Sequence, residues 1–266
     1  MGVYFQKEDT TSLDNAVQSI LSQDFSDFEF LICDDGSVKS ASDRLDRLAE
    51  NDSRIRLIRP GKCYTLPQKL NLLFQKSSGA FIARMDDDDI SYPNRFSQQL
   101  RYLIAHPEIA FAGCNVDFLS ATGEKNEHTF PEFPLPRDFR FSMPFIHPAL
   151  LFRREALEKA NGYSEDPSCL LNEDYDLLLR LYALGMPGAN VQNRLFAYSM
   201  AGVELRHKRY RYRVNEAKVR YRRFRDLGML PASLPYVVKP LLIGLLPLSL
   251  VNRLRNARNK QEGKKN

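Results

Sequence analysis

Residues 81–90 read Phe81-Ile82-Ala83-Arg84-Met85-Asp86-Asp87-Asp88-Asp89-Ile90, and the interpretation of the whole chain depends on them. An apolar run that is typical of a strand ends there in four consecutive carboxylates. Like charges side by side repel each other by about 1 kcal/mol per close pair in water, and by more where water is excluded. Because the run lies in mid-chain, it predicts either a fully solvated turn or a site for a divalent cation.

The composition indicates a globular protein without special covalent chemistry. At 266 residues the chain is long enough for one large domain, or for one domain with an appendage. Its four cysteines are widely spaced and form no C-x-x-C pair, which argues against a zinc site or a disulfide framework. No basic region followed by an apolar run is present at the N-terminus, so no signal peptide is expected and a cytoplasmic protein is predicted.

Strand and helix patterns alternate along the chain before and after the acidic run. Residues 1–5 indicate the end of a strand whose start is missing or very short. This alternation predicts a parallel or mostly parallel sheet with helices on both faces. Ligands bind such sheets at the carboxyl ends of their strands, so Asp34-Asp35 and the acidic run are expected on the same edge. The sequence predicts strands at 28–33, 55–58, 81–85, 109–118 and 149–152, helices at 14–23, 40–51, 66–76, 93–106, 154–160 and 173–184, and a long loop at 120–146.

The last quarter of the chain has a different character. The net charge is +5, and residues 206–225 form a densely basic predicted helix. Residues 234–251 are apolar but contain three prolines and a lysine, so a segment lying on a membrane surface fits better than a spanning helix. The basic helix is either a solvated face, a partner for the acidic domain, or a surface for anionic lipid. No nucleic-acid-binding motif accompanies it.

Four stretches, taken in order, resemble family 2 glycosyltransferases, in particular the bacterial enzymes that build exopolysaccharide and O-antigen repeat units. The resemblance covers roughly residues 1–200. It implies the GT-A fold, an α/β architecture with a mixed, mostly parallel central sheet flanked by helices. Residues 1–205 would be the glycosyltransferase domain, and 206–266 a basic and apolar helical extension. The matching stretches are Asp34-Asp35-Gly36-Ser37, residues 83–95, Ile146-His147-Pro148 and Asn172-Glu173-Asp174-Tyr175-Asp176.

The resemblance implies that the acidic run holds a divalent metal. Asp86-Asp87-Asp88 matches the D-x-D motif, with Asp88 as the direct metal ligand and Asp86 near the ribose and the donor sugar. Oxygen ligands suit Mn²⁺ or Mg²⁺, and such a cation neutralises the charge that develops on a diphosphate leaving group. A solvated acidic turn is the alternative to this interpretation.

Other residues are assigned to the nucleotide-sugar donor by the same resemblance. Asp34 and Asp35 match nucleotide-binding aspartates, with Asp35 on the base, and the main chain around Val3 would line the base pocket. Lys69 and Asn71 fall where similar proteins contact the donor. For Asp34-Asp35, an aspartate turn after a strand is an equally simple and compatible interpretation.

The remaining candidates concern the acceptor. Asp174 is the predicted general base, since transfer to an alcohol requires removal of the hydroxyl proton. Glu173 would orient the loop or the acceptor. On local grounds, Glu173, Asp174 and Asp176 could instead all be first-turn acids that stabilise a helix. His147 would border the donor sugar and acceptor, or serve as a structural hydrogen-bonding group.

Together these features predict a metal-dependent inverting glycosyltransferase, with inversion implied by the resemblance alone. The donor would be a nucleoside-diphosphate sugar, UDP-linked, and the acceptor a polyprenyl-diphosphate-linked oligosaccharide or another saccharide. Surface polysaccharide biosynthesis at the inner face of the cell membrane, in peripheral contact with anionic lipid, would be its setting. The alternative is a catalytically silent protein that binds nucleotide sugars or acts as a membrane scaffold.

Overall fold

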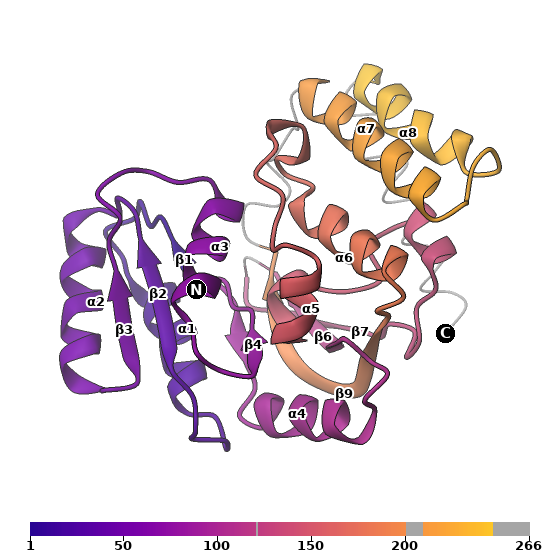
Figure 1. Ribbon diagram of the computed structural model, residues 1–266. Helices are drawn as coiled ribbons and strands as arrows, with labels where there is room; N and C mark the ends of the chain where they lie inside the picture. Colours follow the sequence, from indigo (N-terminus) through magenta and orange to yellow (C-terminus); the bar gives the residue numbers. More distant parts are fainter. Residues whose placement is uncertain (121, 201–209, 247–266) are drawn as a thin grey trace.

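The computed structural model describes residues 1–120, 122–200 and 210–246, which fold around two sheets (Figure 1). The first sheet is parallel, with the strand order β1-β2-β3. Helix α2 lies at the outer end of the molecule, α1 packs between this sheet and β5 of the second sheet, and α3 connects the two sheets in the chain. These elements are β1 (Gly2–Val3), α1 (Thr11–Leu21), β2 (Phe30–Asp34), α2 (Lys39–Asn51), β3 (Ile55–Ile58) and α3 (Leu66–Lys76).

Local sequence explains why these elements form where they do. Every residue of β2 is buried, as its unbroken apolar run predicted. Helix α3 begins with a capping box, in which the Thr65 main-chain N–H donates to Gln68 Oε1 at 2.9 Å, and Pro67 lies in its first turn. The helices predicted at 14–23, 40–51 and 66–76 are confirmed to within a few residues.

The second sheet is mixed, and it contains the acidic run. Its strand order is β4-β8-β6-β9-β5, with β7 paired to the outer part of β6. Only β6 and β9 run parallel within it, while the other pairs are antiparallel. The remaining elements are β4 (Phe81–Ala83), β5 (Ile90–Ser91), α4 (Arg95–Ala105), β6 (Phe111–Leu119), β7 (Lys125–His128), β8 (Leu151–Arg153), α5 (Arg154–Lys159), α6 (Glu173–Ala183) and β9 (Gly188–Ser199).

The acidic run does not follow a strand of the parallel sheet, which corrects the sequence-based expectation. β4 pairs antiparallel with β8, so Asp34-Asp35 and the acidic run leave two different sheets. β1 is short and pairs with β2 through Gly2 and Val3 alone, and among the described residues it does not pair with β4. A cavity of about 720 Å³ lies between β2 and β4, lined mainly by apolar side chains of β2, α3, β4 and α4.

Two further features differ from the sequence-based expectations. Residues 120–146 are not wholly irregular, since they contain β7 and a 3₁₀ helix at Pro136–Arg140. The 12-residue strand β9 was not predicted at all. It runs beside the whole length of β6 with a register shift around Asn115, and β5 pairs with its far end. β9 therefore holds together the part of the second sheet that carries the acidic turn.

Helix α4 is fixed to the acidic segment by a fully buried arginine. Arg95 Nη2 donates to the carbonyls of Arg84 at 2.9 Å and Leu150 at 3.2 Å, and its Nε donates to Gln99. Gln99 in turn donates to the carbonyls of Ala112 and Ala149. The main-chain carbonyl groups at the ends of these strands thus receive hydrogen bonds from two side chains of α4. These bonds fix the path of the chain into the acidic turn.

The C-terminal helices α7 (Tyr210–Asp226) and α8 (Leu234–Leu245) pack beyond α6, at the far end of the molecule from the first sheet (Figure 1). Ala217, Val219 and Phe224 of α7 share a buried core with α6. The predicted boundary at 205/206 and the basic stretch after residue 246 lie outside the described residues. Within the described ranges, no helix has the length and apolarity required to cross a membrane.

Candidate active site

The turn after β4 separates the four aspartates by orientation. Asp88 is exposed and Asp86 is partly exposed, with 30% of its side chain accessible. Asp89 points inward, where its Oδ1 accepts a hydrogen bond from the Ser199 main-chain N–H at 2.7 Å. Asp87 lies half-buried at the start of the turn. Asp88 is therefore the most exposed of the four aspartates, and with Asp86 it is one of the two that match the D-x-D motif.

The pKa values of Asp87 and Asp89 are raised by burial and by the negative charges beside them. Burial, followed by the negative charge of Asp86, raises the pKa of Asp89 to about 8. Burial and the charges of Asp86 and Asp88 raise the pKa of Asp87 to about 6. Such shifts are expected where like charges crowd together away from water. The turn is thus not the fully solvated acidic loop that was the simpler alternative.

A buried cation lies directly under the turn. Arg84 is almost inaccessible, and its Nη1 pairs with Asp86 Oδ1 at 2.6 Å. Although burial opposes it, the charge of Asp86 keeps the pKa of Arg84 above its ordinary value, so the guanidinium stays charged. The sequence analysis quoted Arg84 without assigning it a role. Its position between a strand and an acidic run was the available signal.

His147 is part of a buried hydrogen-bonding pair. Its Nε2 lies 2.8 Å from the hydroxyl of Tyr163, and both side chains are buried. Burial, helped by the positive charge of Arg84, lowers the pKa of His147 well below its ordinary value. A neutral imidazole that positions Tyr163 agrees with the structural interpretation left open for this residue. Tyr163 itself was not singled out from the sequence.

The three acids at the start of α6 have different surroundings. Asp176 is buried and accepts hydrogen bonds from Arg180 Nε and Arg223 Nε, both at 2.8 Å, so it joins α6 to α7. Glu173 is buried, and its Oε2 has no hydrogen-bond partner among the described residues. Asp174 is only partly buried, and its Oδ1 accepts from the Tyr175 main-chain N–H. The stabilising role considered for all three fits Asp176 best.

Tyr198, near the end of β9, connects the acidic turn with the start of α6. Burial raises the pKa of Tyr198 to about 12, and the negative charges of Asp89, Asp86, Asp88 and Asp174 contribute. Charges act on a group in this way only when they lie within the short range of unscreened electrostatic interaction. Tyr198 therefore lies within electrostatic range of both the turn after β4 and Asp174 at the start of α6.

A second cluster forms at the edge of the first sheet. Lys69 of α3 pairs with Asp35 Oδ1 at 2.5 Å and donates to the carbonyl of Val3 at 3.1 Å. Asp35 Oδ2 also accepts from the Tyr64 main-chain N–H at 2.6 Å. The structure thus brings together Val3, Asp35 and Lys69, three of the residues assigned to the donor. A base bound here would have to share these carboxylate oxygens with Lys69 and Tyr64.

Asp34 has a different environment from Asp35. Its carboxylate accepts from the Ser37 N–H at 3.1 Å, the Ser42 hydroxyl at 3.0 Å and Arg59 Nε at 3.2 Å. Burial alone would raise its pKa, but the bonds from Ser37, Ser42 and Arg59 outweigh burial and hold the pKa of Asp34 below its ordinary value. This is the aspartate turn that was considered beside the nucleotide-binding role.

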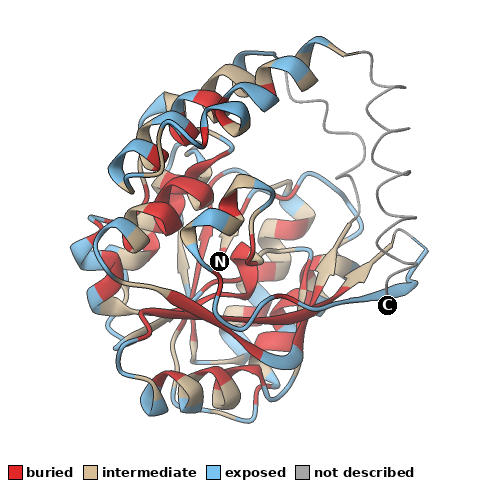
Figure 2. Ribbon diagram, turned by 90° about the vertical axis from the view of Figure 1, so that its right-hand side faces the viewer, coloured by how far each residue is buried: buried red, intermediate tan, exposed pale blue. Residues whose placement is uncertain are grey.

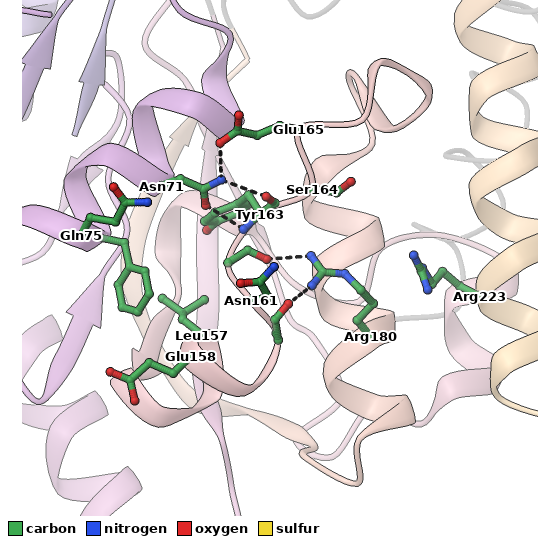
Figure 3. A pocket seen from close by; sticks show the side chains of 13 residues that line it. Asn71, Gln75, Leu157, Glu158, Asn161, Tyr163, Ser164, Glu165, Arg180 and Arg223 are labelled. Atoms are coloured by element: carbon green, nitrogen blue, oxygen red, sulfur yellow. Dashed lines mark hydrogen bonds between the residues drawn. The ribbon is translucent and has the colours of Figure 1, made fainter.

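Asn71 proves to be a clamp on the loop that precedes α6. Its amide bonds both the N–H and the carbonyl of Tyr163, at 2.8 and 2.9 Å, and also Glu165 (Figure 3). These bonds occupy the side chain, so the expected contact of Asn71 with a donor is replaced by a structural role. A pocket of about 730 Å³ opens beside the clamp and is lined by residues of α3, α5, α6 and α7; among the residues assigned to the donor or acceptor from the sequence, Asn71 alone is part of this lining.

The residues of the turn fit a metal only in combination with a substrate. No group of three or more His, Cys, Asp or Glu side chains within residues 1–120, 122–200 and 210–246 could hold a metal ion. Asp88 and Asp86 offer one or two carboxylates, and Mg²⁺ is usually bound by that number together with substrate phosphates and water. The donor set therefore suits a cation that arrives with a diphosphate.

Comparison with solved structures identifies the fold. A mannosyltransferase from Pyrobaculum calidifontis, in complex with GDP-Man and Mn²⁺, matches 96% of this chain and 78% of its own with a TM-score of 0.61 at 15% identity. TarS 1–349 of S. aureus, in complex with UDP-GlcNAc, matches 90% of this chain and 72% of its own with a TM-score of 0.69 at 12% identity. The protein has the GT-A fold of glycosyltransferases.

Comparison of sequences identifies the family. The chain belongs to glycosyl transferase family 2, whose model matches residues 4–160. It is 28% identical to EpsE of Bacillus subtilis (strain 168), over 99% of this chain and 95% of that protein. It is 28% identical to the amylovoran biosynthesis glycosyltransferase AmsE of Erwinia amylovora, over 70% of each. It is also 31% identical to the O-antigen biosynthesis glycosyltransferase WbnJ of Escherichia coli, over 64% of this chain and 66% of that protein.

The buried pair of Lys69 and Asp35 gives a first testable prediction. Lys69→Met should destabilise the protein by about 3–5 kcal/mol, because it leaves the Asp35 carboxylate buried without its counter-charge. Lys76→Met, at an exposed position of the same helix, should change the free energy of unfolding by less than about 0.5 kcal/mol. Urea denaturation without nucleotide measures both. The double variant Asp35→Asn/Lys69→Met should regain part of the lost stability. Equal stability of Lys69→Met and Lys76→Met would contradict the prediction.

Glu173 gives a prediction for the dependence of stability on pH. Burial, followed by the charge of Asp174, raises its pKa from 4.5 to about 7, against the opposing charge of Arg84. The folded state therefore binds this proton more tightly than the unfolded state, and stability falls as pH rises through this interval. Relative to Glu173→Gln, the wild type should lose about 3 kcal/mol between about pH 4 and pH 8. Denaturation curves across that range measure the difference.

The control for this series is Glu158→Gln, which changes an exposed glutamate. Its stability should follow that of the wild type at every pH. A difference between the wild type and Glu173→Gln that stays constant with pH would show that Glu173 ionises normally.

Proposed function

We propose that this protein transfers a sugar from a nucleoside-diphosphate sugar, UDP-linked, to a hydroxyl of a saccharide acceptor in surface polysaccharide biosynthesis. The observation that carries the proposal is the acidic turn after β4 in a chain of glycosyl transferase family 2, where Asp88 is exposed and Asp86 partly exposed. A transfer needs a site for an anionic leaving group and a base for the attacking hydroxyl, side by side. The relatives named for amylovoran and O-antigen biosynthesis support the polysaccharide setting.

Asp86 and Asp88 form the donor end of this site. When bound, the divalent cation neutralises the charge that the diphosphate gains as the glycosidic bond breaks. Asp88, exposed at the tip of the turn, would contact it directly, while Asp86 stays linked to Arg84 and lies nearer the ribose and sugar. The Pyrobaculum calidifontis mannosyltransferase, solved with Mn²⁺, supports a divalent metal. Asp35 and the main chain at Val3 would hold the base.

Asp174 would remove the acceptor proton at the other end. The acceptor oxygen forms a bond to the anomeric carbon, the bond from that carbon to the diphosphate oxygen breaks, and the hydroxyl proton passes to Asp174. One displacement of this kind inverts the anomeric centre. Glu173, held buried beside Asp174 with a pKa of about 7, would keep the loop in place. A helix N-terminus favours the ionised form that a base requires.

The acceptor we propose is a polyprenyl-diphosphate-linked oligosaccharide, reached at the inner face of the cell membrane. Basic side chains on α7 are compatible with an anionic lipid-linked group. A silent nucleotide-sugar-binding or scaffold protein is the competing hypothesis. It is favoured by the closed contact of Asp35 with Lys69 and Tyr64 at the proposed base site. Release of UDP from a UDP-sugar in the presence of Mn²⁺ would exclude it.

The metal assignment predicts how nucleotide binding depends on Mn²⁺. Thermal-shift measurements with UDP or GDP should show a rise in melting temperature that is larger with Mn²⁺ than without, because ligand binding stabilises the folded state. Asp88→Asn should abolish this Mn²⁺-dependent increment, while Asp27→Asn, an exposed aspartate near the end of α1, should retain it. Equal stabilisation by UDP with and without Mn²⁺ would refute the metal role, and stabilisation by GDP alone would refute the UDP assignment.

The base assignment predicts a separation of binding from turnover. Asp174→Asn should lower the rate of UDP release from UDP-GlcNAc by about 10²–10⁴-fold, the usual contribution of a positioned general base. The stabilisation by UDP and Mn²⁺ should remain, since Asp174 lies at the acceptor end. Asp27→Asn again serves as the control and should keep full activity. A wild-type rate in Asp174→Asn would mean that another group accepts the proton.

A further inference from the structure

Helix α8 exposes a row of apolar side chains on its outer side. Leu234, Val238, Leu242 and Leu245 are 41%, 43%, 60% and 70% exposed, and are spaced by four, four and three residues. This spacing places them on one side of a helix. A contiguous apolar surface of this kind on a folded domain usually marks a binding site for protein or membrane.

The opposite side of α8 is already used for packing. Val237 and Pro240 are buried, and a side chain at Gly244 would collide with Tyr210, because the two helices approach closely there. The ring of Tyr236 packs edge-on against Phe141. α8 is therefore firmly packed on its inward side, and the exposed apolar row forms its outward side.

Exposed cations lie on α8 and on α7, the helix that packs against it. Arg211, Lys218 and Arg225 are exposed and follow each other at intervals of seven residues, so they lie on one side of α7, and Lys239 is exposed on α8. Exposed acids near α7 are themselves paired, Asp226 with Arg223 and Arg225, and Asp166 with Arg222. We name the apolar row of α8 together with these cations the hairpin face; its exposed positions lie on the outermost helices of the molecule (Figure 1, Figure 2).

We propose that the hairpin face docks the protein on an anionic lipid bilayer. Apolar side chains in a row with cations at their border match the interface between acyl chains and anionic headgroups. A helix of 12 residues spans about 18 Å, so α8 lies in the interface rather than across the hydrocarbon core of about 30 Å. The excess of positive charge favours anionic lipid over a second copy of this equally basic chain.

Docking there has a consequence for the proposed function, on which this part of the inference rests. Helix α7 is joined to the start of α6 through the bond of Arg223 to Asp176 and through Arg220, which donates to the Tyr175 hydroxyl at 3.1 Å. The face that meets the lipid is thus rigidly connected to the helix that presents Asp174. A lipid-linked acceptor would be held on the same surface as the enzyme.

Sedimentation with lipid vesicles tests the docking. The full chain should bind vesicles that contain phosphatidylglycerol and bind pure phosphatidylcholine vesicles at least about fivefold more weakly for each cation engaged. Leu242→Glu, which places a charge in the centre of the apolar row, should lower binding at least tenfold, roughly the effect of moving a charge into an apolar interface. Lys218→Gln should lower binding about fivefold and reduce its sensitivity to salt.

The matched control is Ile104→Glu, which introduces the same charge at an exposed apolar residue of α4, outside the hairpin face. It should bind vesicles like the wild type. Absence of wild-type binding, or equal loss in Leu242→Glu and Ile104→Glu, would overturn the proposal. So would gel filtration showing a wild-type dimer that Leu242→Glu converts to a monomer without a change in lipid binding, because the face would then join two copies of the chain.

A second measurement separates this proposal from the catalytic one. Leu242→Glu should keep the wild-type thermal shift with UDP and Mn²⁺, since α8 contributes no residue to the proposed site. Loss of that shift in the variant would indicate unfolding and rule out Leu242→Glu as a probe of docking. The milder Val238→Ser would then test the docking, with an expected threefold loss of lipid binding. Lipid binding by a wild type that fails to bind any nucleotide would leave the docking intact and refute the donor assignment.

Discussion

The site depends on one buried cation, the guanidinium of Arg84. It pairs with Asp86, and its charge influences the ionisation of His147 and Glu173 as well. Without this positive charge, burial and mutual repulsion would disfavour the ionised form of the carboxylates near it. The main chain of Arg84 is itself held by Arg95 from α4. Two buried guanidinium groups, those of Arg84 and Arg95, therefore lie close to the acidic turn.

Much of the secondary structure could be predicted from the periodicity of apolar residues. The parts that could not be predicted depend on pairing between strands far apart in the sequence. The helices at 40–51 and 66–76 and the strand at 55–58 have strong local patterns, and they form where predicted. The partner of β4 could not be known, because a three-residue strand carries no signal for choosing β8 over β1. β9 was missed for a related reason: polar residues interrupt its apolar pattern where Gln192 to Arg194 are exposed, and the pairing with β6 overrides that interruption.

For the site, the residue types were predictable and their partners were not. The acidic run, Glu173 and Asp174 stand out in the sequence as carboxylates placed at the end of a strand and at the start of a helix. The different roles of neighbouring acids could not be predicted, because they depend on which side chain points inward. Asp89 accepts a hydrogen bond from β9, and Asp176 pairs with two arginines. Tyr198 carries no sequence signal at all, since an aromatic residue in a strand is ordinarily part of a core.

Helix α3 has a position that gives it influence over both ends of the site. Two residues apart on this helix, Lys69 holds Asp35 and Val3 of the first sheet, while Asn71 holds the loop that leads to α6. Helix α3 therefore holds both the edge of the first sheet and the loop that leads to α6. Under the proposed function, a base bound at Asp35 and an acceptor bound beside Asp174 would both contact elements that this one helix holds in place, and α3 would couple the two binding events.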